Sequence, residues 1–176
     1  MTSWQHDLID IGANLLDPMF RGQYRGKQAH EDDFDLMIKR ARHANVKHIM
    51  VTAGSLQESR EALQLALSKP EYRGFLYSTV GVHPTRAHLF ESDDAEDAEQ
   101  YLQHLIDLAK SGKQKGVVVA VGECGLDYGR SSMIVQYDEY GSIQSHQCVD
   151  RLHFCDKDVQ KRHFQKHFRI TEETKL

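Results

Sequence analysis

The sequence predicts an α/β fold built on a parallel sheet, and two observations lead to that prediction. Short apolar runs rich in β-branched residues recur along the chain, and each is followed by a segment whose apolar residues repeat at helical spacing. Four such strand-then-helix units in succession predict parallel strands joined by right-handed crossovers. One domain is expected, because 176 residues suffice for one core and are too few for two large ones.

The predicted strands are residues 8–12, 46–51, 75–80 and 117–121. The last is a continuous apolar run closed by Gly122, which fits a parallel strand covered on both faces better than a helix. Helices are predicted over residues 31–44, 55–67, 94–110 and 156–170. The second begins with a capping-box pattern, Ser55 to Glu58, and the fourth has Val159, Phe164 and Phe168 facing inward.

An open sheet and a barrel both satisfy this pattern. Neither GxGxxG nor GxxxxGK[ST] occurs, which favours a TIM-type barrel over a nucleotide-binding open sheet. An eight-unit barrel needs about 250 residues, so four units correspond to about half a barrel. Residues 129–149 lack a helical period, and we interpret them as a poorly ordered insertion. Their composition favours retained noncoding sequence over the alternative of a loop extension that supplies Arg130.

Composition excludes several classes of protein. A net charge of −4 and a sequence pI near 6.2 do not indicate a nucleic-acid coat protein, so any basic contact surface must be local. The three cysteines form no CxxC pair and no even set, which argues against a disulfide scaffold or a structural zinc site. The longest apolar runs have strand length. We therefore expect an intracellular protein that does not enter a membrane.

Polar side chains follow the predicted strands at their carboxyl ends. Asp10 and Asn14 follow the first strand, His83 the third, and Glu123 and Asp127 the fourth. In a barrel these side chains would face one mouth, where carboxylates and imidazoles suit a divalent cation that assists phosphate-ester hydrolysis. Each residue also has a purely structural interpretation: Asp10 as a backbone cap, Asn14 in an Asx-turn, His83 in a turn before proline, and the acids in a solvated turn.

Four motifs carry a resemblance to a known family. Residues 122–127, GECGLD, resemble the GE[CI]GLD motif of the TatD family of metal-dependent deoxyribonucleases, which are amidohydrolase-type barrels. Residues 10–15, 17–26 and 79–85 resemble the first-strand motif, the following loop of eukaryotic members, and the third-strand motif. The resemblance covers nearly all of the chain except residues 129–149. It implies that residues 1–176 are the N-terminal part of one TatD-like domain, which hydrolyses DNA in the nucleus or cytoplasm.

The resemblance also implies a site. Glu123 matches the metal-ligand position, and Asp10 and Asn14 line the same mouth. His83 faces substrate phosphate and Asp127 orients a water or a basic partner, so that Glu123, His83 and Asp127 form the expected catalytic set. The implied cofactor is a divalent cation, Mg²⁺ first, with Mn²⁺ or Zn²⁺ as alternatives, and the implied partner is DNA.

Two departures separate this chain from the family pattern. Where DxHxH members use two histidines as metal ligands, this chain has Gly12 and Asn14, as one branch of the family does. The further ligands that members carry after the fifth, sixth and eighth strands do not occur in it. Two other hypotheses therefore stay open: a noncatalytic half-barrel that is unstable or pairs with another chain, and a related barrel that hydrolyses a small cyclic amide.

Three further patterns involve basic residues. The loop with Arg21, Tyr24, Arg25 and Lys27 is the favoured DNA contact, because cations and an aromatic ring suit backbone phosphates and an unpaired base. His163 and His167 have the i, i+4 spacing of helical zinc sites without an HExxH glutamate, and a solvated helix face is preferred. The same preference applies to the basic residues of that helix, which are Lys161, Arg162, Lys166 and Arg169.

Overall fold

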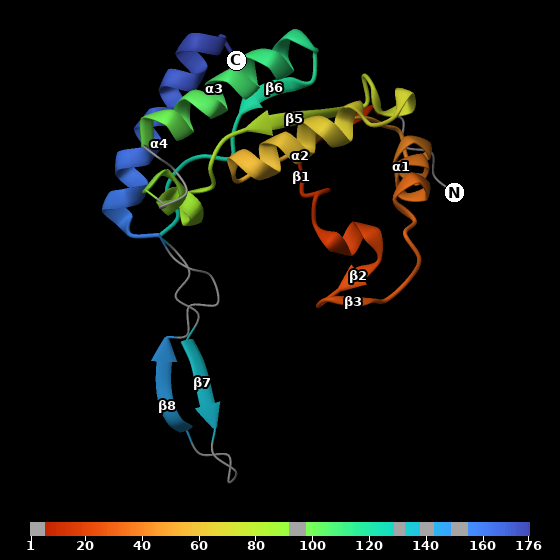
Figure 1. Ribbon diagram of the computed structural model, residues 1–176. Coiled ribbons are helices and arrows are strands. Elements are labelled where there is room, and N and C mark those ends of the chain that lie inside the picture. Colours follow the sequence, from red (N-terminus) through yellow and green to blue (C-terminus); the bar gives the residue numbers. More distant parts are fainter. Residues whose placement is uncertain (1–5, 92–97, 129–132, 138–142, 149–154) are drawn as a thin grey trace.

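The computed structural model describes residues 6–91, 98–128, 133–137, 143–148 and 155–176. Four strands form one parallel sheet in the order β1 (Leu8–Ala13), β4 (Val46–Val51), β5 (Leu76–Val80) and β6 (Val118–Val121). All four predicted strands are confirmed, each to within one residue at either end. Parallel strands that neighbour one another in chain order, with helices between them, form a partial α/β barrel (Figure 1).

The helices are α1 (Phe34–His43), α2 (Leu56–Leu67), α3 (Ala98–Gln114) and α4 (Lys157–Thr174). The 3₁₀ turn η1 (Pro18–Arg21) precedes α1, and η2 (Pro70–Tyr72) and η3 (Pro84–Glu91) lie between α2 and α3. The start predicted for the third helix, residues 94–97, lies outside the described residues, and the helix runs four residues beyond the predicted end. The predicted cap of α2 is present, because the Glu58 amide donates to Ser55 Oγ at 3.1 Å.

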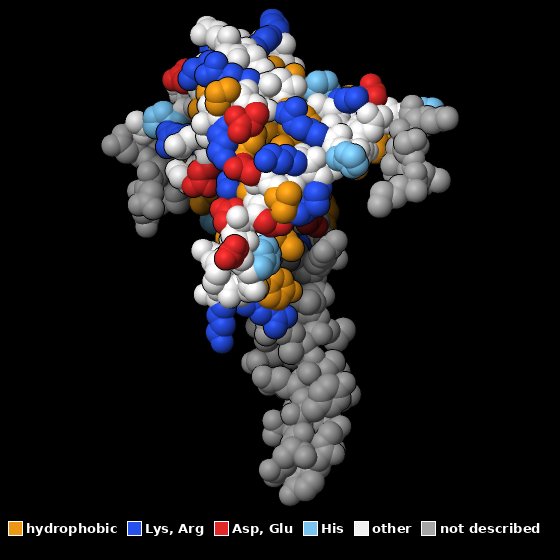
Figure 2. Space-filling model, turned by 90° about the vertical axis from the view of Figure 1, so that its right-hand side faces the viewer, with side chains coloured by type: hydrophobic (Ala, Val, Ile, Leu, Met, Phe, Trp, Pro, Cys, Tyr) orange, Lys and Arg blue, Asp and Glu red, His pale blue; other side chains and the backbone are white. Residues whose placement is uncertain are grey.

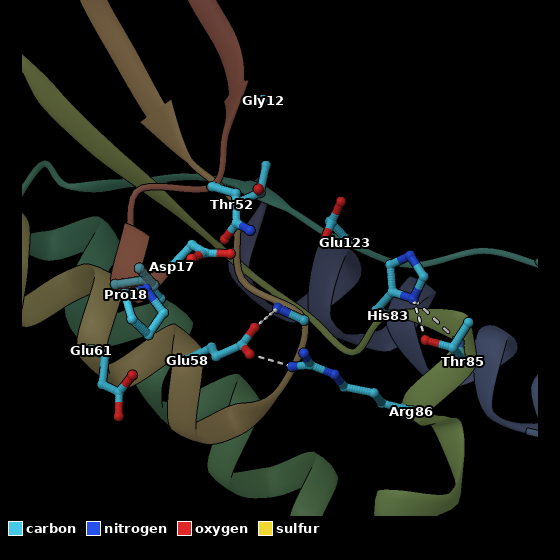
Figure 3. A pocket seen from close by; sticks show the side chains of 13 residues that line it. Gly12, Asp17, Pro18, Thr52, Glu58, Glu61, His83, Thr85, Arg86 and Glu123 are labelled. Atoms are coloured by element: carbon cyan, nitrogen blue, oxygen red, sulfur yellow. Dashed lines mark hydrogen bonds and ion pairs between the residues drawn. The ribbon is translucent and has the colours of Figure 1, made fainter. Parts of the chain in front are cut away.

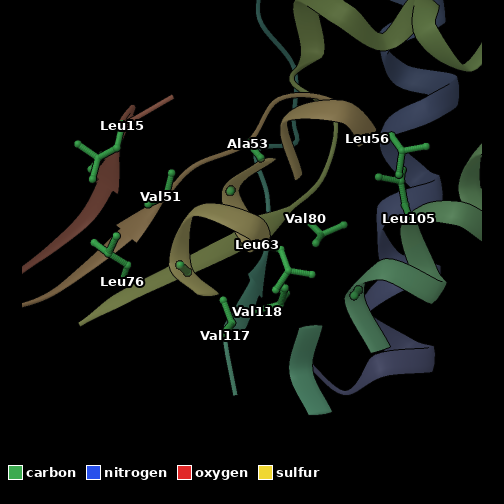
Figure 4. Packing of buried hydrophobic residues seen from close by; sticks show 14 of the residues in the cluster. Leu15, Val51, Ala53, Leu56, Leu63, Leu76, Val80, Leu105, Val117 and Val118 are labelled. Carbon is green, nitrogen blue, oxygen red and sulfur yellow. The ribbon is translucent and has the colours of Figure 1, made fainter. Parts of the chain in front are cut away.

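The sheet buries one of its faces. Ile49, Leu76 and Val118 are almost fully buried, and their face packs on a layer that includes Leu63 and Leu105 of the helices (Figure 4). The residues that alternate with them, such as Met50 and Tyr77, are partly exposed, and Val119 is 45 % exposed. This period-2 alternation places α2 and α3 against the same face of the sheet.

Helix α4 packs against α3 and η3, with an inner face that differs from the predicted one. Phe168 is 56 % exposed, and the buried residues are Gln160, His163, His167, Ile170 and Thr174. The prediction that Phe168 faces inward was wrong, because hydrogen bonds from buried polar side chains, and not the aromatic ring, determine which face of the helix is covered.

Two pairs of antiparallel strands form small sheets separate from the main one. Strands β2 (Gln23–Tyr24) and β3 (Lys27–Gln28) pair through a two-residue turn in which Arg25 and Gly26 both have positive φ, the conformation that a tight hairpin requires. Strands β7 (Met133–Tyr137) and β8 (Ile143–Cys148) lie within the segment interpreted as an insertion and form a separate antiparallel sheet. Arg130 lies outside the described residues. No helix in the described part of the chain is long and apolar enough to cross a membrane.

Candidate functional site

The carboxyl ends of three strands are joined by backbone hydrogen bonds. The His83 amide donates to the Gly54 carbonyl at 3.1 Å, and the Glu123 amide donates to the Ala53 carbonyl at 2.8 Å. Residues that follow β4, β5 and β6 are thereby held at fixed positions relative to one another. Gly81 permits this approach, because a Cβ there would lie 2.5 Å from the Glu123 carbonyl oxygen.

A cavity of about 520 Å³ opens at this edge of the sheet (Figure 3). Asn14, His83 and Glu123 all line it, and they come from the ends of β1, β5 and β6. The structure therefore brings together three of the side chains that the sequence places at strand ends. The other lining residues are Gly12, Leu16, Asp17, Pro18, Thr52, Gly54, Glu58, Glu61, Thr85 and Arg86.

Asp10 and Asp127 are not part of that lining. Asp10 is exposed, and its Oδ1 accepts a hydrogen bond from the Gly12 amide at 3.0 Å, as its structural interpretation proposes. The backbone of Asp127 is held by Gln160, whose Oε1 accepts from the Asp127 amide at 2.8 Å and whose Nε2 donates to the Asp127 carbonyl at 3.0 Å. Of the expected metal set, only Glu123 and Asn14 share the cavity.

His83 presents one ring nitrogen to its own loop. Its Nδ1 lies 2.7 Å from Thr85 Oγ1 and accepts from the Thr85 amide at 3.3 Å. A ring nitrogen that accepts from an amide carries no proton, so the neutral ring has its N–H at Nε2. His83 thus both shapes the turn and retains one donor for the cavity.

Four carboxylates and one guanidinium line the cavity. The acids are Asp17, Glu58, Glu61 and Glu123, and Arg86 is the one Lys or Arg among the described lining residues. Arg86 Nη1 forms an ion pair with Glu58 Oε1, while Glu58 Oε2 accepts from the Gly54 amide at 2.8 Å. An excess of carboxylates attracts cations and repels phosphate unless a cation is present.

The sequence did not indicate Arg86 or Glu58 as site residues. Glu58 was assigned only to the start of α2, and Arg86 follows His83 by three residues in η3. Thr52, which also lines the cavity, directly follows β4. Its position after a strand is a signal that could have identified it.

The expected DNA-contact loop lies apart from the cavity lining. The Arg21 guanidinium stacks 3.9 Å from the Phe34 ring and lies 3.4 Å from an Asp32 oxygen, so it is engaged within the fold. Tyr24 is 58 % exposed and stacks with Arg25 at 5.5 Å. On the face shown in Figure 2, basic and acidic side chains are interspersed, in keeping with ion pairs such as Arg40–Asp33 at 3.0 Å.

The two histidines of α4 are buried, so the solvated-face interpretation was wrong for them. His163 Nε2 lies 2.7 Å from Glu91 Oε1, and its ring stacks on Phe90 with 4.8 Å between centroids. Both nitrogens of His167 contact backbone groups, which leaves neither for a metal. The basic residues of α4 are paired with acids: Lys161 with Asp158, Arg162 with Glu91, and Lys166 and Arg169 with Glu99.

The donors at the cavity are of the oxygen-rich type that divalent cations prefer. Within the part of the chain that the structure describes, however, no three His, Cys, Asp or Glu side chains converge at metal-binding distances. The described residues therefore do not form a complete metal site by themselves.

The consecutive parallel strands and the polar cavity at their carboxyl ends define part of an α/β barrel of the TIM type. The chain belongs to the TatD related DNase family, whose model matches residues 9–176. It is 41 % identical over 167 residues to the Deoxyribonuclease Tat-D of Schizosaccharomyces pombe, covering 95 % of this chain and 45 % of that protein. It is 36 % identical over 124 residues to the 3'-5' ssDNA/RNA exonuclease TatD of Edwardsiella piscicida, covering 70 % and 38 %.

A solved structure agrees with this membership. The hydrolase TatD family protein from Entamoeba histolytica superposes with a TM-score of 0.70 at 31 % identity, over 95 % of this chain and 46 % of that one. The chain thus spans less than half the length of these relatives.

Proposed function

We propose that the protein hydrolyses phosphodiester bonds of DNA and that this chain contributes the half of the barrel that carries Glu123, His83 and Asn14. The observation that supports this most directly is the convergence of these three side chains on one cavity, in a chain of the TatD related DNase family. The names of the S. pombe and E. piscicida relatives favour DNA, and single strands in particular, as the substrate class.

The cavity residues have complementary roles toward a phosphate. The Nε2–H of His83 can donate to a phosphate oxygen, and a donor held by its own loop needs little reorganisation when charge develops there. The carboxylates give the cavity a negative field, so a polyanionic strand requires a cation at the same place. We propose a divalent cation, Mg²⁺ first and Mn²⁺ or Zn²⁺ as alternatives, with Glu123 as one of its ligands in the complete barrel.

A nuclease assay tests the proposal. The purified chain is incubated with an end-labelled single-stranded oligonucleotide and Mg²⁺ or Mn²⁺, with EDTA as the blank. Glu123→Gln is compared with Glu71→Gln, the same change at an exposed carboxylate on η2 away from the cavity. We expect cation-dependent cleavage that falls by about 100-fold or more in Glu123→Gln and stays unchanged in Glu71→Gln.

Three results would count against it. Equal cleavage by wild type and Glu123→Gln would refute the site assignment. No cleavage by the wild-type chain would favour the alternative of a noncatalytic half-barrel that needs a second chain. Turnover of a small cyclic amide without cleavage of DNA would instead favour the cyclic-amide hydrolase.

A further inference from the structure

We propose that Arg86 binds a backbone phosphate of the substrate strand and sets its position in the cavity. This inference rests on the proposed function for the identity of the ligand. Arg86 is the one permanent cation among the described residues of the lining, which also include four carboxylates. A phosphate that enters this cavity therefore has one positively charged side chain to bind.

The orientation of Arg86 is fixed from the opposite wall. Glu58 lies in the first turn of α2, where its own amide donates to Ser55 Oγ and its Oε2 accepts from the Gly54 amide at 2.8 Å. The second oxygen of Glu58, Oε1, accepts a hydrogen bond from Arg86 Nη1. The pair links α2 to η3 across the cavity (Figure 3). A carboxylate held in this way restricts the rotamers of the guanidinium before any ligand arrives.

Arg86 retains donors for a ligand. A guanidinium has five N–H donors arranged as a planar fork, and the ion pair with Glu58 is made through Nη1. The Arg86 side chain is 45 % exposed, so part of it is open to solvent. The Arg86 amide donates to the His83 carbonyl at 2.8 Å, which places both residues on one short segment of the cavity wall. A phosphate on Arg86 would thus lie on the wall that also carries the Nε2–H of His83.

The alternative is that the Arg86–Glu58 ion pair only stabilises the fold. An exposed ion pair contributes little to stability, and its loss would leave strand binding unchanged. The chain offers a matched control in Arg169, whose side chain is 46 % exposed and is also paired with a glutamate, Glu99. Arg169 lies on α4 and does not line the cavity.

The test measures binding and not cleavage. Fluorescence anisotropy of a labelled single-stranded oligonucleotide is recorded over a series of salt concentrations, with Ca²⁺ as the cation, for wild type, Arg86→Gln, Arg86→Lys and Arg169→Gln. Each neutralised phosphate on a single strand contributes about 0.7 to the slope of log K against log [salt]. We expect Arg86→Gln to bind about 10-fold more weakly with a slope shallower by about 0.7. Arg86→Lys should keep the slope and bind less tightly, and Arg169→Gln should match wild type.

Each result decides between the alternatives. Wild-type affinity and slope in a folded Arg86→Gln variant, with folding checked by circular dichroism, would overturn the role of Arg86 alone. An equal change in Arg169→Gln would also overturn it, since net charge would then explain the effect. Absence of any binding by the wild type would refute the proposed function and the present inference together.

Discussion

His167 on α4 accepts a hydrogen bond through Nε2 from the backbone amide of Val82, at 3.0 Å. The two residues are 85 positions apart in sequence, and Val82 immediately precedes His83. The other nitrogen of His167 donates to the His163 carbonyl at 3.2 Å, so the buried ring is neutral and fully used by backbone groups. Helix α4 thereby supports the turn that carries a cavity residue.

Replacing His167 should destabilise the fold through this turn. His167→Leu keeps an apolar body but leaves the Val82 amide buried without an acceptor, which costs about 1–3 kcal/mol. Urea unfolding followed by circular dichroism measures the loss. Phe168→Leu, an adjacent and exposed position, is the control and should change stability by less than about 0.5 kcal/mol. An equal loss in both variants would show that the hydrogen bond to Val82 contributes nothing specific.

His167 should also make the folded chain less stable in acid. Burial lowers the pKa of His167 from its ordinary value of 6.5, so the unfolded chain takes up a proton at a higher pH than the folded chain does. The stability it contributes is complete above about pH 6.5 and is lost as pH falls toward the folded pKa. Urea unfolding of wild type should show a lower free energy of unfolding at about pH 5.5 than at about pH 7.5. A His167→Leu variant with the same pH dependence as wild type would contradict this assignment.

The sequence was sufficient to predict the strands and the presence of α4, and insufficient to predict which face of α4 is buried. The run from Val117 to Val121 predicts a strand because four of its five residues are β-branched, a composition that suits a sheet. In α4 the covered side carries Gln160, His163 and His167. Hydrophobic periodicity cannot find such a face, because each polar side chain is buried by a partner distant in sequence.

The candidate site could likewise be predicted only in part from the sequence. Asn14, His83 and Glu123 could be identified because each follows a strand, and parallel strands end at one edge of the sheet. Arg86 and Glu58 belong to the cavity because η3 and α2 lie beside each other there. That proximity is tertiary, and no spacing within either segment encodes it.

Gly81 should tolerate no side chain. A Cβ at this position would lie 2.5 Å from the Glu123 carbonyl oxygen and 2.6 Å from the Gly122 carbonyl carbon, and both are backbone atoms. Gly81→Ala should therefore lower the free energy of unfolding by about 1–3 kcal/mol and displace the segment that carries Glu123. Gly12→Ala is the matched control, because no atom lies within 4 Å of its added Cβ. Equal stability of the two variants in urea would show that the strand ends can separate without cost.

Gln160 should be among the most sensitive positions of α4. It is 1 % exposed, and besides its two bonds to the Asp127 backbone its Nε2 donates to the Cys155 carbonyl at 2.8 Å. Gln160→Ala removes all three bonds, two to the part-buried Asp127 backbone and one buried bond to Cys155, so we expect a loss of about 2–4 kcal/mol. Gln165→Ala, on the exposed side of the same helix, should change stability little. Comparable melting temperatures for the two variants would contradict the role assigned to Gln160.

Tyr72 should lose its proton only at unusually high pH, and its ionisation should destabilise the fold in alkali. Burial, together with a hydrogen bond to the Asp35 carboxylate, raises the pKa of Tyr72 from 10 to about 12. The folded state therefore holds the proton where the unfolded state releases it, so this stability is complete below about pH 10 and is lost as pH rises toward 12. Absorbance of tyrosinate, compared between wild type and Tyr72→Phe, measures the titration.

Asp35→Asn should lower the pKa of Tyr72 only part of the way to 10, because burial is the larger cause and the substitution leaves it in place. A return to 10 in that variant would show that the carboxylate, and not burial, dominates the shift.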